Sequence, residues 1–203
     1  MAPIVGAVVA ARTREKLMAL TFDDGPDPEW TPRLLDLLAR RGMRATFFLV
    51  GTRAAAHPDL VARIAAEGHD IGNHSWDHPS LPSLPLAAIE DQLARTRAAL
   101  APYGAGLLRP PYGDRTLASH RLARRMGYLT VLWSISANDW EPLGADALAE
   151  RVLARAAPVA ERLPDYRFVT VGELLRSGPA VLRSRMWQSN ADWRGALLTD
   201  PAY

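Results

Sequence analysis

The chain has 203 residues, of which 48% are hydrophobic and 23% are charged; it contains no cysteine and carries a formal net charge of +2 at pH 7. These values are typical of one globular domain with a substantial core. They exclude disulfides and thiolate metal sites, and the small, scattered positive charge gives no electrostatic basis for a nucleic-acid partner. No apolar run approaches the roughly 20 residues of a membrane span.

Short apolar strands alternate with amphipathic helices along the chain. The first segment, "MAPIVGAVVAA", has the apolar character of a signal sequence but lacks a preceding positive region, so we interpret it as an early strand. The predicted strands cover residues 1–11, 16–22, 45–51, 69–75, 106–113, 128–135 and 166–175, the last of which continues into a helical turn, and the predicted helices cover residues 28–42, 57–68, 85–104, 117–127 and 144–158.

This alternation predicts a parallel α/β architecture, a barrel or part of one. We expect residues 1–176 to form a single domain, because no repeat, linker or low-complexity tract divides them. The remaining residues, 177–203, contain Gly, Pro and two Trp and form a tail to which the pattern assigns no structure.

Four polar clusters follow predicted strands: "DDGP", "NHSWDH", "RPPYG" and "SANDW". In parallel α/β folds, active and ligand-binding sites lie at the carboxyl ends of the strands. We therefore expect the four clusters to meet at one end of the sheet.

The sharpest of these signals is "HSWDH". His74 and His78 are four residues apart, so a single helical turn, ended by Pro79, would place both imidazoles on one face. Two neutral imidazoles and one carboxylate form a metal triad with open coordination positions. The alternative is a pair of surface histidines in a polar loop.

The motifs "TFDDGP", "HSWDH", "RPPYG" and "DW", in this order between Lys16 and Leu175, resemble the polysaccharide deacetylase family, also called the NodB-homology domain or carbohydrate esterase family 4. The resemblance implies a distorted (β/α) barrel and metal-dependent removal of acetyl groups from N-acetylated or O-acetylated sugars in polysaccharides such as peptidoglycan or chitin oligomers. It also suggests an extracellular or cell-envelope location.

The resemblance assigns the metal ligands as Asp24, His74 and His78, with zinc as the first choice of ion and cobalt, manganese or nickel as alternatives. It assigns Asp23 as the general base. The Gly-Pro turn that follows would break strand alternation and let both carboxylates converge. Either carboxylate alone could instead cap the next helix, but Asp27 fits that role better.

Four further residues receive roles. Arg109 would orient Asp23 through a bidentate ion pair, although a surface salt bridge is an alternative. The resemblance implies that the backbone N–H of Tyr112 stabilises an oxyanion, that Trp140 helps to form the acetyl pocket, and that Asp139 supports the charge network. Trp140 could equally belong to the core.

The three other histidines receive no role in the site. We expect His69 to be a hydrogen-bonded loop residue, and His57 and His120 to lie on helices, exposed to water.

The chain departs from the family at one point. The family has a further strand with a leucine-x-histidine motif, whose histidine acts as general acid, and this strand has no counterpart between Pro158 and Val159. No histidine follows His120. A missing strand would open a barrel edge, which the tail, a second copy of the chain or water must cover.

Three hypotheses remain open: a sugar deacetylase, a degenerate member that binds metal and glycan with little or no turnover, and a structural domain whose motifs are coincidental. The expected partner under the first two is an acetylated oligo- or polysaccharide.

Overall fold

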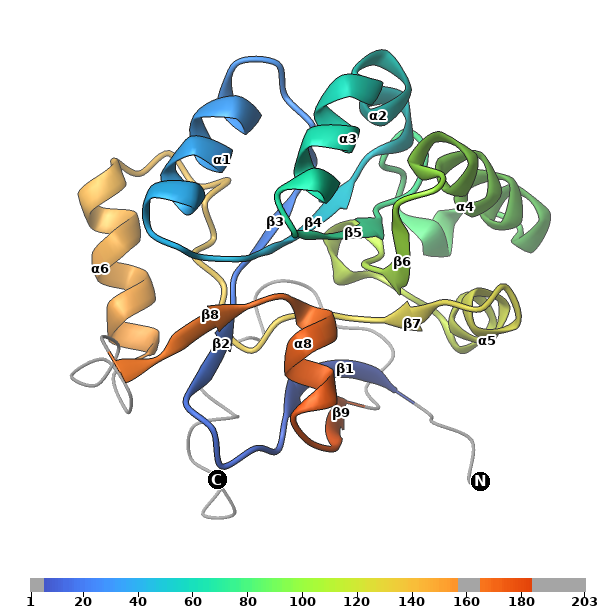
Figure 1. Ribbon diagram of the computed structural model, residues 1–203. Coiled ribbons are helices and arrows are strands. Elements are labelled where there is room, and N and C mark those ends of the chain that lie inside the picture. Colours follow the sequence, from blue (N-terminus) through green and yellow to red (C-terminus); the bar gives the residue numbers. More distant parts are fainter. Residues whose placement is uncertain (1–5, 157–164, 184–203) are drawn as a thin grey trace.

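A computed structural model describes residues 6–156 and 165–183 (Figure 1). The strands are β1 (Ala7–Ala11), β2 (Leu17–Ala19), β3 (Thr21–Asp23), β4 (Thr46–Leu49), β5 (Asp70–Asn73), β6 (Gly104–Leu108), β7 (Leu129–Thr130), β8 (Arg167–Val169) and β9 (Ala180–Arg183). The α-helices are α1 (Trp30–Arg40), α2 (Gly51–Ala56), α3 (Pro58–Ala66), α4 (Leu86–Leu100), α5 (Leu117–Arg125), α6 (Ala145–Arg155) and α8 (Val171–Arg176), and the 3-10 helices are η1 (Leu81–Ser83) and η2 (Pro111–Gly113). The junction between Pro158 and Val159, and most of the expected tail, lie outside the described residues.

The main sheet is parallel and has the strand order β3-β4-β5-β6-β7. This confirms the predicted parallel α/β architecture. Helices α1 to α5 form an arc on the outside of these strands (Figure 1). All four residues of β4 are buried, as expected for a parallel strand with both faces covered. On the helix side, the core contains Leu35, Phe47, Ile64 and Ile71.

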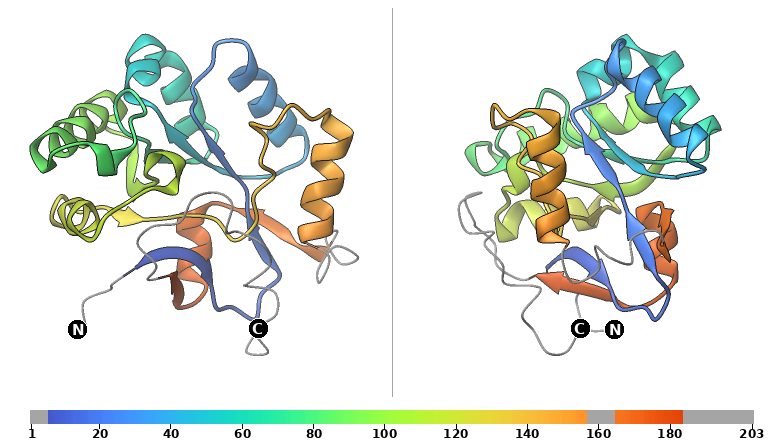
Figure 2. Two further views of the ribbon diagram at one scale, coloured as in Figure 1. Left: turned by 180° about the vertical axis from the view of Figure 1, so that it is seen from behind. Right: turned by 90° about the vertical axis from the view of Figure 1, so that its left-hand side faces the viewer.

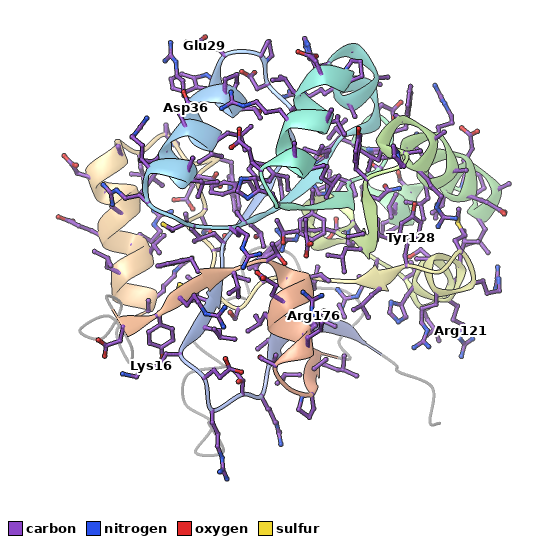
Figure 3. The ribbon with its side chains drawn as sticks, in the orientation of Figure 1. Lys16, Glu29, Asp36, Arg121, Tyr128 and Arg176 are labelled. Carbon is purple, nitrogen blue, oxygen red and sulfur yellow. The ribbon has the colours of Figure 1, made fainter. Side chains whose placement is uncertain are left out.

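The predicted strand over residues 16–22 is divided in two. β2 pairs in parallel with β8, whereas β3 pairs in parallel with β4. Together they carry the chain from Lys16 toward the end of the molecule where Glu29 lies, at the start of α1 (Figure 3). The polar residues after β3 are therefore delivered to the end of the sheet at which the parallel strands finish.

Residues 7–11 of the first predicted strand form β1, which lies beside the last strand of the main sheet, whereas residues 1–5 lie outside the described residues. Val8 forms a parallel bridge with Val131, and the amide of Leu132 donates to the carbonyl of Val8 at 2.8 Å. β1 also pairs antiparallel with β9, and the two strands lie side by side below the main sheet (Figure 2). Within the described ranges, no ladder joins β8 to β1, β7 or β9, so hydrogen bonding does not close a full barrel there.

Several predictions of local structure were incomplete, among them the following two. α2 was not predicted, because its six residues carry too short an apolar pattern to be distinguished from the end of a strand. The strand expected over residues 128–135 is reduced to β7, since the chain leaves the sheet after Val131 and continues as a loop. None of the helices in the described part of the chain is long and apolar enough to cross a membrane.

Candidate metal centre and active site

Asp23 and Asp24 stand at the carboxyl end of β3. Asp23 is the last strand residue, and Asp24 adopts a left-handed conformation with φ of 68°. This change of backbone conformation breaks the strand alternation that would send successive side chains to opposite faces. Oδ2 of Asp23 and Oδ1 of Asp24 consequently lie 3.9 Å and 3.3 Å from Nε2 of His74. The predicted convergence of the two carboxylates is confirmed.

His74 and His78 lie in the loop that follows β5. The predicted helical turn between them is wrong, because this loop is irregular and both Ser75 and His78 have left-handed backbone conformations, with φ of 66° and 64°. The loop nevertheless brings the two rings to a centroid separation of 4.9 Å. Non-glycine residues rarely adopt positive φ, and such residues concentrate where function constrains the backbone.

Asn73 fixes the start of this loop, a role that the sequence interpretation missed. Its side-chain oxygen accepts from the amide of Ser75 at 2.9 Å, and its nitrogen donates to the Leu93 carbonyl at 2.9 Å and to the Tyr128 hydroxyl at 2.8 Å. Tyr128 lies near α5 (Figure 3). The signal was available in the sequence, since a buried amide directly before a candidate ligand is well placed to orient it.

The three candidate metal ligands meet in one cluster. Single ligand atoms of Asp24, His74 and His78 all lie within 4.8 Å of one another. Nδ1 of His74 is 2.6 Å from the Arg109 carbonyl oxygen, which can only accept, so Nδ1 carries the proton. The other ring nitrogen, Nε2, lies 3.3 Å from Oδ1 of Asp24 and is the atom that would face a bound ion. The donor set therefore fits a divalent cation.

The charges of the cluster favour ligand protonation states. The hydrogen bond with His74 lowers the pKa of Asp24, against the effect of partial burial, and the charges of His74, His78 and Arg53 lower it further. Partial burial lowers the pKa of His78, as does the neighbouring His74, while Asp24 and Asp23 act in the opposite direction. Both shifts favour the ionised carboxylate and the neutral imidazole, which are the forms that bind metal.

Arg109 is almost fully buried at the end of β6 and bonds to Asp23. Its Nη1 lies 2.7 Å from Oδ1 of Asp23 and 2.8 Å from Oγ1 of Thr21. The predicted pairing is confirmed, but its bidentate geometry is wrong. The other donors, Nη2 and Nε, bond to the carbonyls of Leu132 and Val131 instead, at 2.9 Å and 3.3 Å. The guanidinium is thus tied to β3 and to the chain leaving β7.

Tyr112 lies beside the cluster in η2. Its ring contacts the His78 ring edge-on with a centroid separation of 4.7 Å, and its backbone has φ of 58°. Within the part of the chain that the structure covers, the Tyr112 amide donates no backbone hydrogen bond. The third motif is thus placed next to the second one.

Asp139 and Trp140 are not brought into contact with the cluster. Both are exposed in a turn, Trp140 to 57%, so Trp140 is not a core residue. The loop that carries them is held by α6: Arg151 bonds to the carbonyl of Ala137 at 3.0 Å, and Arg155 bonds to the carbonyl of Ser136. Because β7 ends at Thr130, this fourth cluster starts several residues beyond its strand rather than at the strand end.

The other histidines and Asp27 have structural surroundings. Nδ1 of His69 accepts from the amide of Ala45 at 3.1 Å, as expected of a hydrogen-bonded residue. His120 is buried against β7, 3.3 Å from the Thr130 hydroxyl, so the prediction that it is exposed was wrong: it lies on the inner face of α5. His57 is half-buried at the junction of α2 and α3. Oδ1 of Asp27 accepts from the amides of Glu29 and Trp30, which confirms its capping role at α1.

Comparisons with known proteins agree with this geometry. A family model described as polysaccharide deacetylase matches residues 10–131. The chain is 40% identical over 144 residues to a peptidoglycan-N-acetylglucosamine deacetylase of Bacillus cereus, covering 70% of this chain and 52% of the relative. It is 39% identical over 153 residues to a chitooligosaccharide deacetylase of Rhizobium leguminosarum bv. trifolii, covering 74% of this chain and 71% of the relative. The chain thus spans about half the length of the Bacillus cereus relative.

Solved structures show the same relationship. A peptidoglycan N-acetylglucosamine deacetylase in complex with 4-naphthalen-1-yl-N-oxidanyl-benzamide has a TM-score of 0.75 at 29% identity, covering 84% of this chain and 92% of that one. A family 4 carbohydrate esterase from Streptomyces lividans in complex with acetate has a TM-score of 0.70 at 28% identity, covering 85% of this chain and 99% of that one. The protein therefore belongs to the polysaccharide deacetylase family.

Proposed function

We propose that this protein is a metal-dependent hydrolase that removes acetyl groups from the sugars of polysaccharides such as peptidoglycan or chitin oligomers. The observation that carries the proposal is the Asp24–His74–His78 cluster beside the Asp23–Arg109 ion pair. The names of the relatives support the same reaction class, since one is a peptidoglycan-N-acetylglucosamine deacetylase and the other a chitooligosaccharide deacetylase. The pairing of Asp23 with Arg109, the proposed base and its partner, supports turnover over the alternative of a degenerate member without turnover.

Asp24, His74 and His78 would hold the ion, and nitrogen and oxygen ligands in this number favour zinc. When bound, a divalent ion supplies Lewis-acid chemistry, which makes water a stronger acid and polarises a carbonyl group.

Asp23 has the geometry of a general base. Arg109 occupies Oδ1, so the carboxylate is held in one orientation while Oδ2 faces the cluster. Oδ2 is therefore the oxygen that takes the proton from the attacking water. A charged, hydrogen-bonded partner keeps the base in position without adding a second group that could take the proton.

Tyr112 would contribute its backbone N–H to the oxygen that becomes negative when the acetyl carbonyl is attacked. A preorganised N–H donor in such a position typically contributes about 10²–10³-fold in rate. Asp139 and Trp140 stay proposed contributors, to the charge network and the acetyl pocket, and would have to approach the cluster when substrate binds.

The test is acetate release by the full chain from N-acetylated and O-acetylated oligosaccharides, with zinc added and after treatment with a chelator. Zinc-dependent release is the expected result, and it should be lost in Asp23→Asn. Release that persists without metal, or in the variant, would contradict the proposal. No release from any substrate by the zinc-loaded protein would favour the degenerate alternative.

A further inference from the structure

A pocket of about 550 Å³ adjoins the candidate metal centre on the side of α1. Its lining comes from the end of β3, from α1, from β4 and from α2, and consists of Phe22, Asp23, Asp24, Gly25, Asp27, Trp30, Thr31, Arg33, Leu34, Leu37, Phe47 and Arg53. A glycan whose acetyl group reaches the cluster has a second sugar within a few ångströms of it. The pocket is therefore in the right place to receive a neighbouring unit of the chain.

One wall of the pocket is an exposed indole. Trp30 is 62% exposed although it is the first residue of α1, and the guanidinium of Arg33 lies 4.9 Å from its ring centroid. Arg33 is itself paired with Glu29 at 3.2 Å. An aromatic surface that is apolar yet flanked by polar groups suits a pyranose ring, which has an apolar face and a polar edge.

The acidic residues of the pocket are already compensated. Asp23 bonds to Arg109, Asp24 contacts two imidazoles, and Asp27 accepts from two amides of the α1 start. Each of these carboxylates therefore has partners that balance or disperse its charge.

Arg53 is different. It belongs to α2 and is exposed, and within residues 6–156 and 165–183 no carboxylate oxygen lies within 4.0 Å of its guanidinium. Its charge still reaches the cluster, because it contributes to lowering the pKa of Asp24, of Asp27 and of His78. Arg53 is thus the cation of the pocket wall that has no carboxylate partner of its own.

We propose that this pocket binds a sugar that carries a carboxylate, with Trp30 under the ring and Arg53 paired to the acid. The inference rests on the proposed function and narrows its substrate class: it favours a glycan with free ether-linked acid groups, as in N-acetylmuramic acid without an attached peptide, over a neutral chitin oligomer and over a glycan whose acid groups are amides. A guanidinium matches a carboxylate with two parallel hydrogen bonds, whereas it gains no charge-assisted bond from a neutral sugar.

The test uses two probes that differ in charge alone: a tetrasaccharide of alternating N-acetylglucosamine and N-acetylmuramic acid with free carboxylates, and the same tetrasaccharide with its carboxyls converted to amides. For the zinc-loaded full chain, kcat/KM should be about three- to tenfold higher for the free acid. In Arg53→Gln this ratio should fall to about one, whereas Arg40→Gln, an exposed arginine of α1 outside the pocket, should keep it. Trp30→Ala should lower kcat/KM for both probes by the same factor, because the indole would contact the sugar ring and not its acid group.

A binding arm separates this inference from the proposed function. In an Asp23→Asn background with zinc, the affinity for each probe is measured by calorimetry, with and without Arg53→Gln. If neither probe is deacetylated by the unsubstituted chain, the proposed function fails, but an Arg53-dependent preference for the free acid still supports the pocket. Equal affinity and equal kcat/KM for the two probes, or a preference that survives Arg53→Gln, would overturn the inference.

Discussion

The backbone carbonyl of Arg109 lies 2.6 Å from Nδ1 of His74, while the side chain of the same residue lies 2.7 Å from Asp23. One residue thus orients two different components of the site. Its main chain fixes the tautomer of a metal ligand, and its guanidinium fixes the base. This dual contact makes Arg109 a positioning residue: replacing its side chain would remove the contact with Asp23, whereas its main-chain carbonyl would stay in place to orient His74.

Asp23→Asn should retain zinc and reduce kcat by about 10²–10⁴-fold, because the amide keeps the shape and hydrogen bond of the carboxylate but cannot take a proton. Because Arg109 acts in part through Asp23, the double variant Asp23→Asn/Arg109→Met should lose much less activity than the sum of the two single losses. The measurements are kcat, zinc content and thermal unfolding of all variants. Full activity in Asp23→Asn would remove it from the role of base.

Each of the variants Asp24→Ala, His74→Ala and His78→Ala should lower zinc affinity by at least about tenfold, since a direct ligand matters at least as much as an outer-shell partner. The measurements are calorimetric titration and elemental analysis after gel filtration. His57→Ala is the matched control, because this histidine lies outside the cluster. Unchanged zinc content in all three variants would show that the ion is held elsewhere.

Amide substrates should be turned over poorly relative to esters. An amine needs a proton in order to leave, an alkoxide needs it less, and no histidine follows His120 to supply one. The measurement is kcat/KM on matched N-acetyl and O-acetyl sugars. A leucine-x-histidine strand grafted between Pro158 and Val159 should raise the amide value by about a hundredfold and the ester value little. Strong amide turnover in the ungrafted chain would show that another residue or a partner supplies the proton.

The stability of the fold should decrease in mild acid through His69. Burial lowers the pKa of this histidine from its usual 6.5, because the charged ring loses its hydration. In the folded protein, Nδ1 of His69 also accepts from the amide of Ala45. Below about pH 6.5 the unfolded chain therefore binds more protons than the folded one. The free energy of unfolding should fall as pH drops from 6.5 through the lower folded pKa. Urea titrations of metal-free protein should show a flatter profile for His69→Gln, with His57→Gln as control; identical profiles would contradict this.

Val8→Ala should destabilise the protein by about 1–3 kcal/mol, a typical cost of removing buried methyl groups. Val8 is buried with Phe48, Leu107 and Val131. Val152→Ala, an exposed valine of α6, is the matched control and should change stability by less than about 0.5 kcal/mol. Urea unfolding measures both. An equally small effect of the two substitutions would show that β1 contributes little to the core.

Local sequence patterns predicted that the proposed metal ligands and the proposed base would lie close together, whereas their roles came from the family resemblance and stay proposals. Asp23, Asp24, His74 and His78 follow strands whose apolar runs are clear, so their approach at one end of the sheet could be anticipated. The backbone conformation between His74 and His78 could not be anticipated in the same way. Ser75 and His78 adopt left-handed conformations, and the loop starts at Asn73, whose side chain bonds to the Ser75 amide and to residues 20 and 55 positions away. No local rule contains those long-range contacts.

Other predictions were wrong or incomplete for related reasons. The bidentate Arg109 pair was wrong because carbonyls on the chain leaving β7 compete for the same donors. His120 was taken as exposed because the amphipathic pattern of α5 does not show how closely the helix packs on β7. Arg53 and Trp30 carry no motif, and only their shared position on one pocket wall draws attention to them.

The pairing of β1 has a consequence for the order of folding. Among the described strands β1 is made first by the ribosome, yet its partners are Val131 and β9, more than a hundred residues later in the chain. Contacts of such sequence separation form slowly, because a long loop must close before they are gained. The earliest strand to be synthesised is thus among the last to be placed. Until then Val8 and its neighbours expose apolar surface, so the nascent chain should depend on chaperones for longer than the order of its strands suggests.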